Sequence, residues 1–469
     1  MNSTTAQEAA AVLADNLSPA FELRSHQHPL VAQLLKRHSA ELSKLVRGLG
    51  SPLHVVLPQI FTENVCRLKK AFTDTGLSGD ILFAKKANKA DCFARACAQQ
   101  GIGIDVASSG ELGKALAAGV LGKHIGISGP EKPSRLLTEA LYHQCLIAID
   151  SVEELVRLTS LANVINCNAR ILLRRKTSNQ ANSRFGLDTK ALAQALDFCQ
   201  AHRQALTLEG FSFHLGGYSL EERARCASEA MDLCLQVQKQ GIATCRRVNI
   251  GGGLPVQYVA PRQWQAFLRQ DAPEHYHAAK TFGEFYPYGG LAQSGQSLVD
   301  LLACAVDSGV SLADKARRHG IGLIVEPGRA LLDQAGMSFF QVLGVKQREA
   351  AQDYALVTVQ GSSLSLSEQW FNSEFLPDPI LLDSDDQAHC QAVFQACIGA
   401  STCLECDMLT WRKIGFPRVL RPGDQLVYLN TAGYQMDSNE SPFHEAELPK
   451  KVVVDLDADL ELQWRLDGV

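Results

Sequence analysis

The stretch Ile81-Leu-Phe-Ala-Lys-Lys-Ala-Asn-Lys-Ala90 ends an apolar run with two adjacent lysines. The run Ile81–Ala84 predicts a buried strand, and a lysine at the end of such a strand is costly to desolvate as a cation. A lysine held neutral there is a nucleophile that forms Schiff bases with aldehydes. Taken alone, a lysine that points to solvent explains the stretch better, so the interpretation depends on the rest of the chain.

Seven further apolar runs follow, and helix-like segments separate most of them. The eight strand candidates are Ile81–Ala87, Ile102–Ala107, His124–Ser128, Cys145–Ile149, Ala169–Arg174, Leu208–His214, Arg247–Ile250 and Ile321–Val325. Unbroken apolar strands that alternate with helices predict a parallel sheet covered on both faces. Eight short units of this kind favour an α/β protein with a closed (β/α)8 barrel over an open doubly wound sheet.

After Arg329 the sequence pattern changes from apolar runs separated by helix-like segments to short alternating stretches. Short alternating stretches such as Tyr354–Gln360 and Gln425–Leu429 predict a C-terminal domain of antiparallel β-strands. We therefore expect three parts: an N-terminal segment (1–49) that packs on the β domain, the barrel (50–335) and the β domain (336–469).

Composition excludes several functional classes. The chain has 469 residues, 46% hydrophobic and 20% charged, with a net charge of −5. This mildly acidic balance argues against nucleic acid as a partner, and no apolar stretch is long enough to cross a membrane. The N-terminus lacks the layout of a signal peptide, and the fourteen cysteines are scattered, so we expect reduced thiols in the cytoplasm. The single Cys-x-x-Cys, Cys403–Cys406, lacks the second pair of a structural zinc site, so no metal is expected.

Polar residues and glycines gather at the predicted carboxyl ends of the strands, where barrels of this kind carry their chemistry. In chain order they are Lys86, Asp105, Arg174, His214, Gly251-Gly252-Gly253 and Glu326-Pro-Gly328-Arg329. Each has an ordinary structural explanation when taken alone, such as a cap, a surface cation, a core histidine, a tight turn or a salt bridge. Six strand ends with this pattern together indicate a functional site at the barrel mouth.

The glycine run indicates what this site binds. Gly251–Gly253 can bring backbone N–H groups close to an anion, and Arg329 can add a charge-assisted contact. Barrels often place a phosphate at the loops after the seventh and eighth strands. A phosphate held opposite a lysine amine predicts pyridoxal 5′-phosphate as the cofactor.

With these motifs the chain resembles the fold-type III pyridoxal-phosphate decarboxylases, the ornithine, arginine and diaminopimelate decarboxylase family with an alanine-racemase-like barrel. Within that family it resembles the Y4yA-like branch. The resemblance spans most of residues 50–450. It rests on motifs in the family's order, namely Phe83-Ala-Lys-Lys-Ala-Asn88, Asp105-Val-Ala-Ser-Ser-Gly-Glu111, Ser183-Arg-Phe-Gly186, Phe213-His-Leu-Gly216, Gly251–Gly253, Glu326–Arg329, Cys403-Leu-Glu-Cys-Asp407 and Ala432-Gly-Tyr434.

The resemblance implies roles for these residues. Lys86 would form the Schiff base, His214 would stack on the pyridine ring, and Glu326 would pair with the ring nitrogen. The remaining cofactor contacts would be Asp105, Arg174, Gly251, Gly252, Gly253, Gly328, Arg329 and Tyr434. The implied activity is decarboxylation of an amino acid or a metabolite derived from one.

The same resemblance implies a homodimer with shared active sites. Cys403 and Asp407 match family positions that reach into the opposite subunit, and Cys403 would return a proton to the substrate carbon. Arg329, Glu405 and Asp407 are the candidate substrate contacts.

Three departures from the family pattern bear on substrate choice and cofactor binding. Leu404 stands where diamine-type decarboxylases have an acid that grips the distal amine, with Glu405 one position later. Gly217 replaces a serine whose hydroxyl binds phosphate, and Arg184 replaces a usual lysine. The alternatives to a decarboxylase are an amino-acid racemase or epimerase on the same barrel, and a non-catalytic homologue that only binds the cofactor.

Overall fold

The computed structural model of the protein describes residues 22–180, 182–290, 294–348, 354–366, 372–382 and 394–468. The chain forms two compact units. The barrel unit comprises Phe61–Pro255 and Ala292–Leu331, and the β unit comprises Met1–Ile60, Val256–Leu291 and Leu332–Val469.

The barrel unit is built on a closed ring of parallel strands, as the sequence predicts. The strands are, in their order around the ring, β11 (Gly322–Val325), β2 (Gly79–Ala84), β3 (Gly103–Val106), β4 (Ile125–Ile127), β5 (Leu146–Ile149), β6 (Ala169–Arg174), β7 (Leu206–Ser212) and β8 (Arg247–Asn249). Each predicted strand is present. The ring interior includes a cluster of buried aliphatic side chains, Leu82, Leu146, Leu172 and Ile324.

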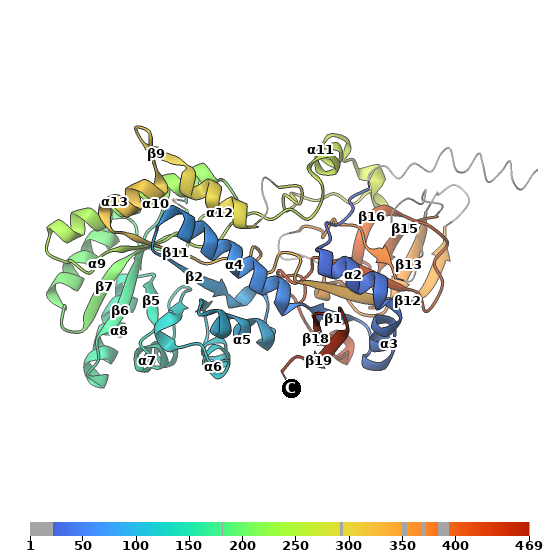
Figure 1. The fold of residues 1–469 in the computed structure, drawn as a ribbon, viewed down its shortest axis with the longest axis horizontal. Coiled ribbons are helices and arrows are strands. Elements are labelled where there is room, and N and C mark those ends of the chain that lie inside the picture. Colours follow the sequence, from blue (N-terminus) through green and yellow to red (C-terminus); the bar gives the residue numbers. More distant parts are fainter. Residues whose placement is uncertain are drawn as a thin grey trace, which may run out of the picture. The chain divides into compact units, whose positions relative to one another are not determined.

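Helices surround the ring in Figure 1, and they bury one face each against the strands. They are α4 (Pro58–Thr75), α5 (Asp91–Gln100), α6 (Ser109–Ala117), α7 (Ser134–Tyr142), α8 (Val152–Ile165), α9 (Thr189–Ala201), α10 (Leu220–Lys239), α12 (Ser294–Ala303) and α13 (Leu312–His319). A short hairpin, β9 (Ala305–Asp307) and β10 (Val310–Ser311), precedes α13.

Serine and glutamate side chains cap the starts of two helices, α6 after β3 and α8 after β5. Before α6, Ser108 Oγ accepts from Glu111 N and Glu111 Oε2 accepts from Ala107 N. Before α8, Ser151 Oγ accepts from Glu154 N, and Glu154 Oε2 accepts from Asp150 N. This reciprocal pairing satisfies backbone donors that a helix start would otherwise leave without a partner.

The β unit contains a sheet in which the described residues form nine strands. They are β1 (Leu53–Val56), β12 (Gly336–Gln347), β13 (Ala355–Val359), β14 (Ile380–Leu381), β15 (Phe394–Gly399), β16 (Met408–Phe416), β17 (Gln425–Leu429), β18 (Lys450–Leu456) and β19 (Leu462–Leu466). The same unit holds α2 (Pro29–Arg37), α3 (Ser39–Leu49) and α11 (Pro261–Gln270).

Two features of the β unit correct the expectations from sequence. Its sheet is mixed and not purely antiparallel, because β1 pairs in parallel with β18, and β13 pairs in parallel with β15. The unit also takes in residues 50–60 and Val256–Leu291, which the sequence placed with the barrel. Residues 50–60 group with the β unit because β1, which lies within them, pairs with both β12 and β18.

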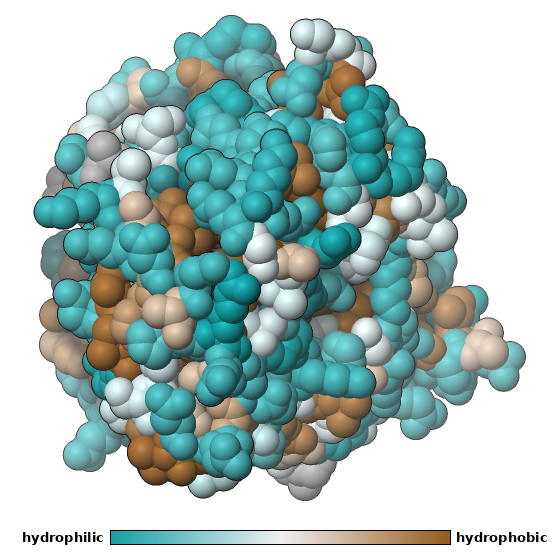
Figure 2. Space-filling model, turned by 90° about the vertical axis from the view of Figure 1, so that its left-hand side faces the viewer, coloured by the Kyte–Doolittle hydropathy of each residue, from teal (hydrophilic) through white to brown (hydrophobic). Residues whose placement is uncertain are grey.

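The face shown in Figure 2 is mainly hydrophilic, and its hydrophobic residues lie in small separate groups. No helix in the described ranges combines the length and the apolar character needed to cross a membrane.

Candidate functional site

The two lysines after β2 have opposite environments. They lie in a short 3-10 turn, Lys85–Ala87. Lys85 is 1% exposed, and its Nζ donates to Lys89 O at 2.8 Å and to Asn88 O and Ala90 O at 3.4 Å each. Lys86 is exposed, and its positive charge acts on both Asp105 and His214. Lys86 is therefore the lysine available for chemistry, whereas Lys85 fixes the backbone of the turn.

Asp105, the penultimate residue of β3, is a buried acid, and one of its carboxylate oxygens has no hydrogen-bond partner among the described residues. Ser128 Oγ donates to Asp105 Oδ2 at 2.9 Å, and Oδ1 is buried without a hydrogen-bond partner in the described part of the chain. Burial and then the nearby Glu326 carboxylate raise the pKa of Asp105 well above its ordinary value, and Lys86 opposes this rise. A polar atom left in this state indicates that a further group belongs at the site.

Glu326, after β11, is oriented by a residue that the sequence reasoning missed. Asn249, at the end of β8, donates from Nδ2 to Glu326 Oε1 at 2.6 Å. Its Oδ1 accepts from Gly251 N at 2.9 Å, and Glu326 N donates to Gly251 O at 2.9 Å. Asn249 thus fixes the carboxylate and the start of the glycine run together. Its place at a strand end, beside the glycines, was a signal that could have identified it.

The glycine run leaves no room for side chains at its first two positions. A Cβ on Gly251 would lie 2.7 Å from His214 Nδ1, and one on Gly252 would lie 2.7 Å from Glu326 O. Gly251 and Gly253 have φ angles of +68° and +81°, which favour glycine. In the neighbouring loop after β11, Gly328 is buried and Arg329 is half-buried.

His214, two residues beyond β7, is surrounded by positive charge. The residue is partly accessible to solvent, yet desolvation lowers its pKa to about 3, with further lowering by the charges of Lys86, Arg223 and Arg174. The imidazole is therefore neutral at physiological pH. A neutral ring suits the predicted stacking on an aromatic cofactor, whereas a cation would add to an already positive site.

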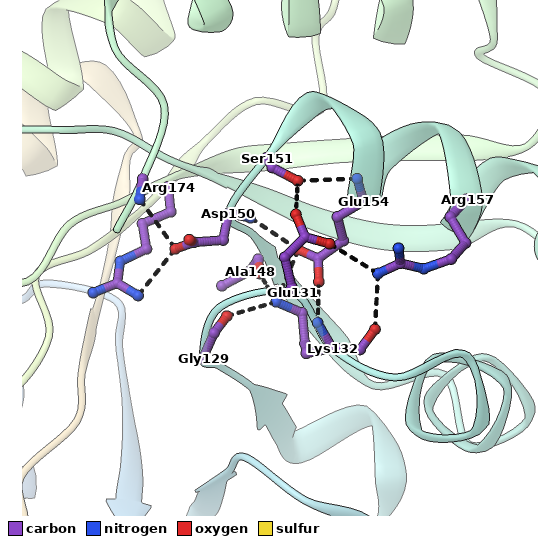
Figure 3. A network of polar contacts seen from close by, with 10 residues as sticks. Gly129, Glu131, Lys132, Ala148, Asp150, Ser151, Glu154, Arg157 and Arg174 are labelled. Carbon is purple, nitrogen blue, oxygen red and sulfur yellow. Dashed lines mark hydrogen bonds and ion pairs between the residues drawn. The ribbon is translucent and has the colours of Figure 1, made fainter. Parts of the chain in front are cut away.

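Arg174, at the end of β6, is held by Asp150 at the end of β5 (Figure 3). Arg174 Nη1 lies 3.1 Å from Asp150 Oδ1, which also accepts from Gly186 N at 3.1 Å. The guanidinium carbon lies 4.5 Å from the centroid of the Phe185 ring. These contacts connect the predicted Arg174 to the Ser183–Gly186 motif, and Asp150 is a second residue that sequence reasoning did not single out.

Figure 3 also shows a buried ion pair behind Asp150, between Lys132 and Glu154. Their side chains are 1% and 0% exposed, with Nζ and Oε2 2.9 Å apart. Lys132 Nζ further donates to Gly129 O at 2.9 Å and to Ala148 O at 2.7 Å. Glu154 accepts from the backbone N–H groups of Lys132 and Asp150. The pair therefore fixes the backbone from which the Asp150 side chain extends.

The predicted residues of the β unit lie in a loop between β15 and β16. Cys403, Leu404 and Glu405 are exposed there, and Cys403 N donates to His444 Nε2 at 3.3 Å. Asp407 is 6% exposed, and its carboxylate accepts from Ser363 N at 2.8 Å and from Thr402 Oγ1 at 2.5 Å. These bonds favour a role for Asp407 in shaping the loop over direct contact with substrate.

Tyr434 also belongs to the β unit and lies five residues beyond β17 in a run of turns. Its φ angle is +76°, a left-handed conformation that is uncommon for a bulky residue. Such positions often occur at functional sites, where the surrounding structure holds the backbone in place.

The barrel residues fit a phosphorylated pyridine aldehyde. Lys86 is exposed, Asp105 has a buried oxygen without a hydrogen-bond partner among the described residues, and the backbone at Gly251 and Gly252 is not covered by side chains of its own. The positive charges near His214 would complement a phosphate group.

Comparisons with known proteins agree with this assignment. The sequence model of the family described as "Pyridoxal-dependent decarboxylase, pyridoxal binding domain" matches residues 60–277. The uncharacterized protein y4yA of Sinorhizobium fredii is 36% identical over 428 residues, which cover 91% of this chain and 93% of that protein. Diaminopimelate decarboxylase of Bacillus subtilis is 25% identical over 435 residues, with 87% of each chain covered.

The fold has close structural counterparts. The crystal structure of diaminopimelate decarboxylase from M. jannaschii in complex with L-lysine matches with a TM-score of 0.68 at 19% identity, and the match covers 88% of this chain and 89% of that one. The match confirms the predicted fold. The chain belongs to the fold-type III pyridoxal-dependent decarboxylase family, and its cofactor is pyridoxal 5′-phosphate.

Proposed function

We propose that this protein decarboxylates an amino acid, or a metabolite derived from one, with Lys86 as the residue that bonds the cofactor. The observation that carries the proposal is the Glu326 carboxylate, held at 2.6 Å by Asn249 at the mouth of the barrel. When bound, the cofactor supplies an electron sink for the carbanion that loss of CO₂ produces, and this sink is strong only while its ring nitrogen is protonated.

The barrel residues serve this chemistry in distinct ways. Glu326 holds the proton on the ring nitrogen, because a nearby negative charge raises the pKa of a cation. His214 provides a neutral stacking surface. The loops that contain Gly251–Gly253 and Gly328–Arg329 would bind the phosphate, and Tyr434 is a further contact that the family resemblance implies. A carboxylate at position 326 favours decarboxylation over racemisation, for which a weaker sink suffices.

Cys403 is the proposed proton donor to the substrate carbon. It is exposed in its loop, as a residue that serves the active site of a second subunit must be before assembly. Asp407 keeps the loop in shape through its bonds to Thr402 and Ser363. The active form we propose is therefore a homodimer with shared sites.

Leu404 shapes the proposed substrate preference. Its side chain is 49% exposed beside Cys403, at the position where an acid would bind a distal ammonium. Burying an ammonium against leucine without a paired charge costs several kcal/mol, on the order of 2–5. We therefore propose that the substrate carries a distal group other than an ammonium. Glu405, the acid adjacent to Leu404, is the residue that could replace the missing contact.

Release of CO₂ from a broad amino-acid panel tests the proposal. The panel contains L-ornithine, L-lysine, meso-diaminopimelate and forms of these acylated on the distal amine. We expect poor turnover of ornithine and lysine, and an improvement of about tenfold or more for Leu404→Asp on both. Glu405→Gln is the matched control for the neighbouring acid. Efficient wild-type turnover of ornithine that survives Glu405→Gln would refute the proposed effect of Leu404 on substrate preference. Interconversion of enantiomers without CO₂ release would favour a racemase.

A further inference from the structure

A buried arginine lies behind the glycine run without a counter-charge among the described residues. Arg223, in the first turn of α10, is 1% exposed. Its Nη1 donates to Ile250 O at 3.1 Å, its Nη2 donates to Gly217 O at 3.2 Å, and its Nε has no hydrogen-bond partner in the described ranges. The carboxylate of the adjacent Glu222 is bonded to Asn179 instead.

This burial is energetically costly. Desolvation lowers the pKa of Arg223 to about 10, and only the smaller effects of Cys226, Glu222 and Tyr218 oppose it. A guanidinium removed from water without an anion beside it is destabilising unless another interaction compensates. The two carbonyl contacts satisfy some of its five N–H donors, but they supply no negative charge.

The position of Arg223 indicates where the missing negative charge belongs. Ile250 immediately precedes the glycine run, and Gly217 lies in the loop between β7 and α10, so one side chain joins the two loops. A Cβ on Gly253 would lie 2.3 Å from Arg223 Nη2, so the guanidinium lies directly against the glycine run. Its charge also reaches His214, whose pKa it lowers.

Gly217 adds a second reason for an additional source of binding energy. A glycine there offers no hydroxyl to a phosphate, and its carbonyl is occupied by Arg223. An anion at the glycine run must therefore obtain its attraction from backbone N–H groups and from nearby positive charges.

We propose that Arg223 is a positioning residue for the phosphate group of the cofactor. It fixes the backbone on both sides of the phosphate loop, and from behind that loop it supplies positive charge that compensates the missing hydroxyl at position 217. This inference concerns binding of the cofactor and not decarboxylation. Its test is therefore independent of which substrate the protein uses.

Equilibrium binding to the cofactor-free protein tests it, because no turnover is needed. Dissociation constants for pyridoxal 5′-phosphate and for unphosphorylated pyridoxal are measured by absorbance for the wild type, Arg223→Met and Arg223→Lys. For Arg223→Met we expect affinity for the phosphorylated form to fall about tenfold or more, while affinity for pyridoxal changes less than about threefold. Arg223→Lys, which keeps the charge, should recover part of this selectivity.

Arg225→Met is the control, because Arg225 lies on the same helix with its side chain 50% exposed, and it should bind both ligands like the wild type. Inorganic phosphate should raise the Tm of the cofactor-free wild type more than that of Arg223→Met. If Arg223→Met does not fold, Arg223→Gln repeats the comparison with a polar but uncharged side chain. Unchanged affinity for pyridoxal 5′-phosphate, or equal losses for both ligands, would overturn the proposal.

Discussion

Lys85 and Lys86 are adjacent lysines with different environments and different expected roles. Lys85 is enclosed by backbone carbonyl groups, and Lys86 is exposed where its charge acts on Asp105 and His214. We expect Lys86→Ala to keep the wild-type Tm and to give no pyridoxyl adduct after borohydride reduction. Lys85→Ala should retain the adduct but lower the free energy of unfolding by about 1–3 kcal/mol, because charge-assisted hydrogen bonds are lost. Peptide mapping and urea unfolding measure both, and an adduct on Lys85 would reverse the assignment.

Asp105 makes the stability of the cofactor-free protein depend on pH. Burial and the Glu326 carboxylate raise its pKa in the folded state, so the unfolded chain releases this proton first as the pH rises. Its contribution to stability is therefore lost between about pH 4 and the raised pKa of the folded state. We expect Asp105→Asn to lose less stability than the wild type between about pH 4 and pH 7 in urea unfolding. The exposed Asp197→Asn is the control, and parallel pH profiles for wild type and Asp105→Asn would contradict the argument.

The sequence allowed prediction of site residues that are chemically conspicuous at strand ends, such as Lys86, Glu326 and His214. It did not allow prediction of Asn249, Asp150 or Arg223 as site residues. Their roles depend on which backbone segments meet after the barrel closes, and a single polar residue in a strand or helix carries no such information. The roles themselves remain predictions that the variants above test.

At the scale of elements, the eight barrel strands were predictable because each is a short apolar run between helices. The strand pairing of the β unit was less predictable from the sequence. The parallel partner of β1 is β18, almost four hundred residues away in sequence, and local alternation does not reveal such pairings. The grouping of Val256–Leu291 with the β unit also depends on tertiary contacts, which the sequence does not reveal.

The loop after β4 and the start of α8 are joined by the buried pair of Lys132 and Glu154. We expect Glu154→Gln to lower the free energy of unfolding by about 3–5 kcal/mol, because it leaves the Lys132 cation buried without its carboxylate. Burial already lowers the pKa of Lys132 in the intact pair. Adding Lys132→Met should recover part of the loss, since both charges are then removed.

The ion pair of Arg135 and Glu139 on α7, whose side chains are 81% and 31% exposed, is the matched control. Glu139→Gln should cost less than about 1 kcal/mol in the same urea unfolding experiment. Equal effects of Glu154→Gln and Glu139→Gln would show that the buried pair does not organise this side of the barrel.

At the scale of the whole molecule, the proposed dimer divides each active site between two chains. Lys86 belongs to the barrel unit and Cys403 to the β unit. If Cys403 serves the partner's barrel, a dimer of one Lys86→Ala chain and one Cys403→Ala chain has two different sites. One site lacks both Lys86 and Cys403, and the other site contains both residues. Random pairing of equal amounts should then restore about one quarter of the wild-type sites.

The two variants, each nearly inactive alone, are co-expressed with different affinity tags, and the doubly tagged dimers are isolated before CO₂ release is assayed. Purified mixed dimers should reach about half of the wild-type activity, because every one of them carries one intact site. Dimers of two differently tagged Lys86→Ala chains control for the tags and should stay inactive. If each site were built from a single chain, every site in the mixed dimer would contain one defect. The mixed dimers would then be as inactive as the separate variants, and the shared-site proposal would fail even if the protein is a dimer.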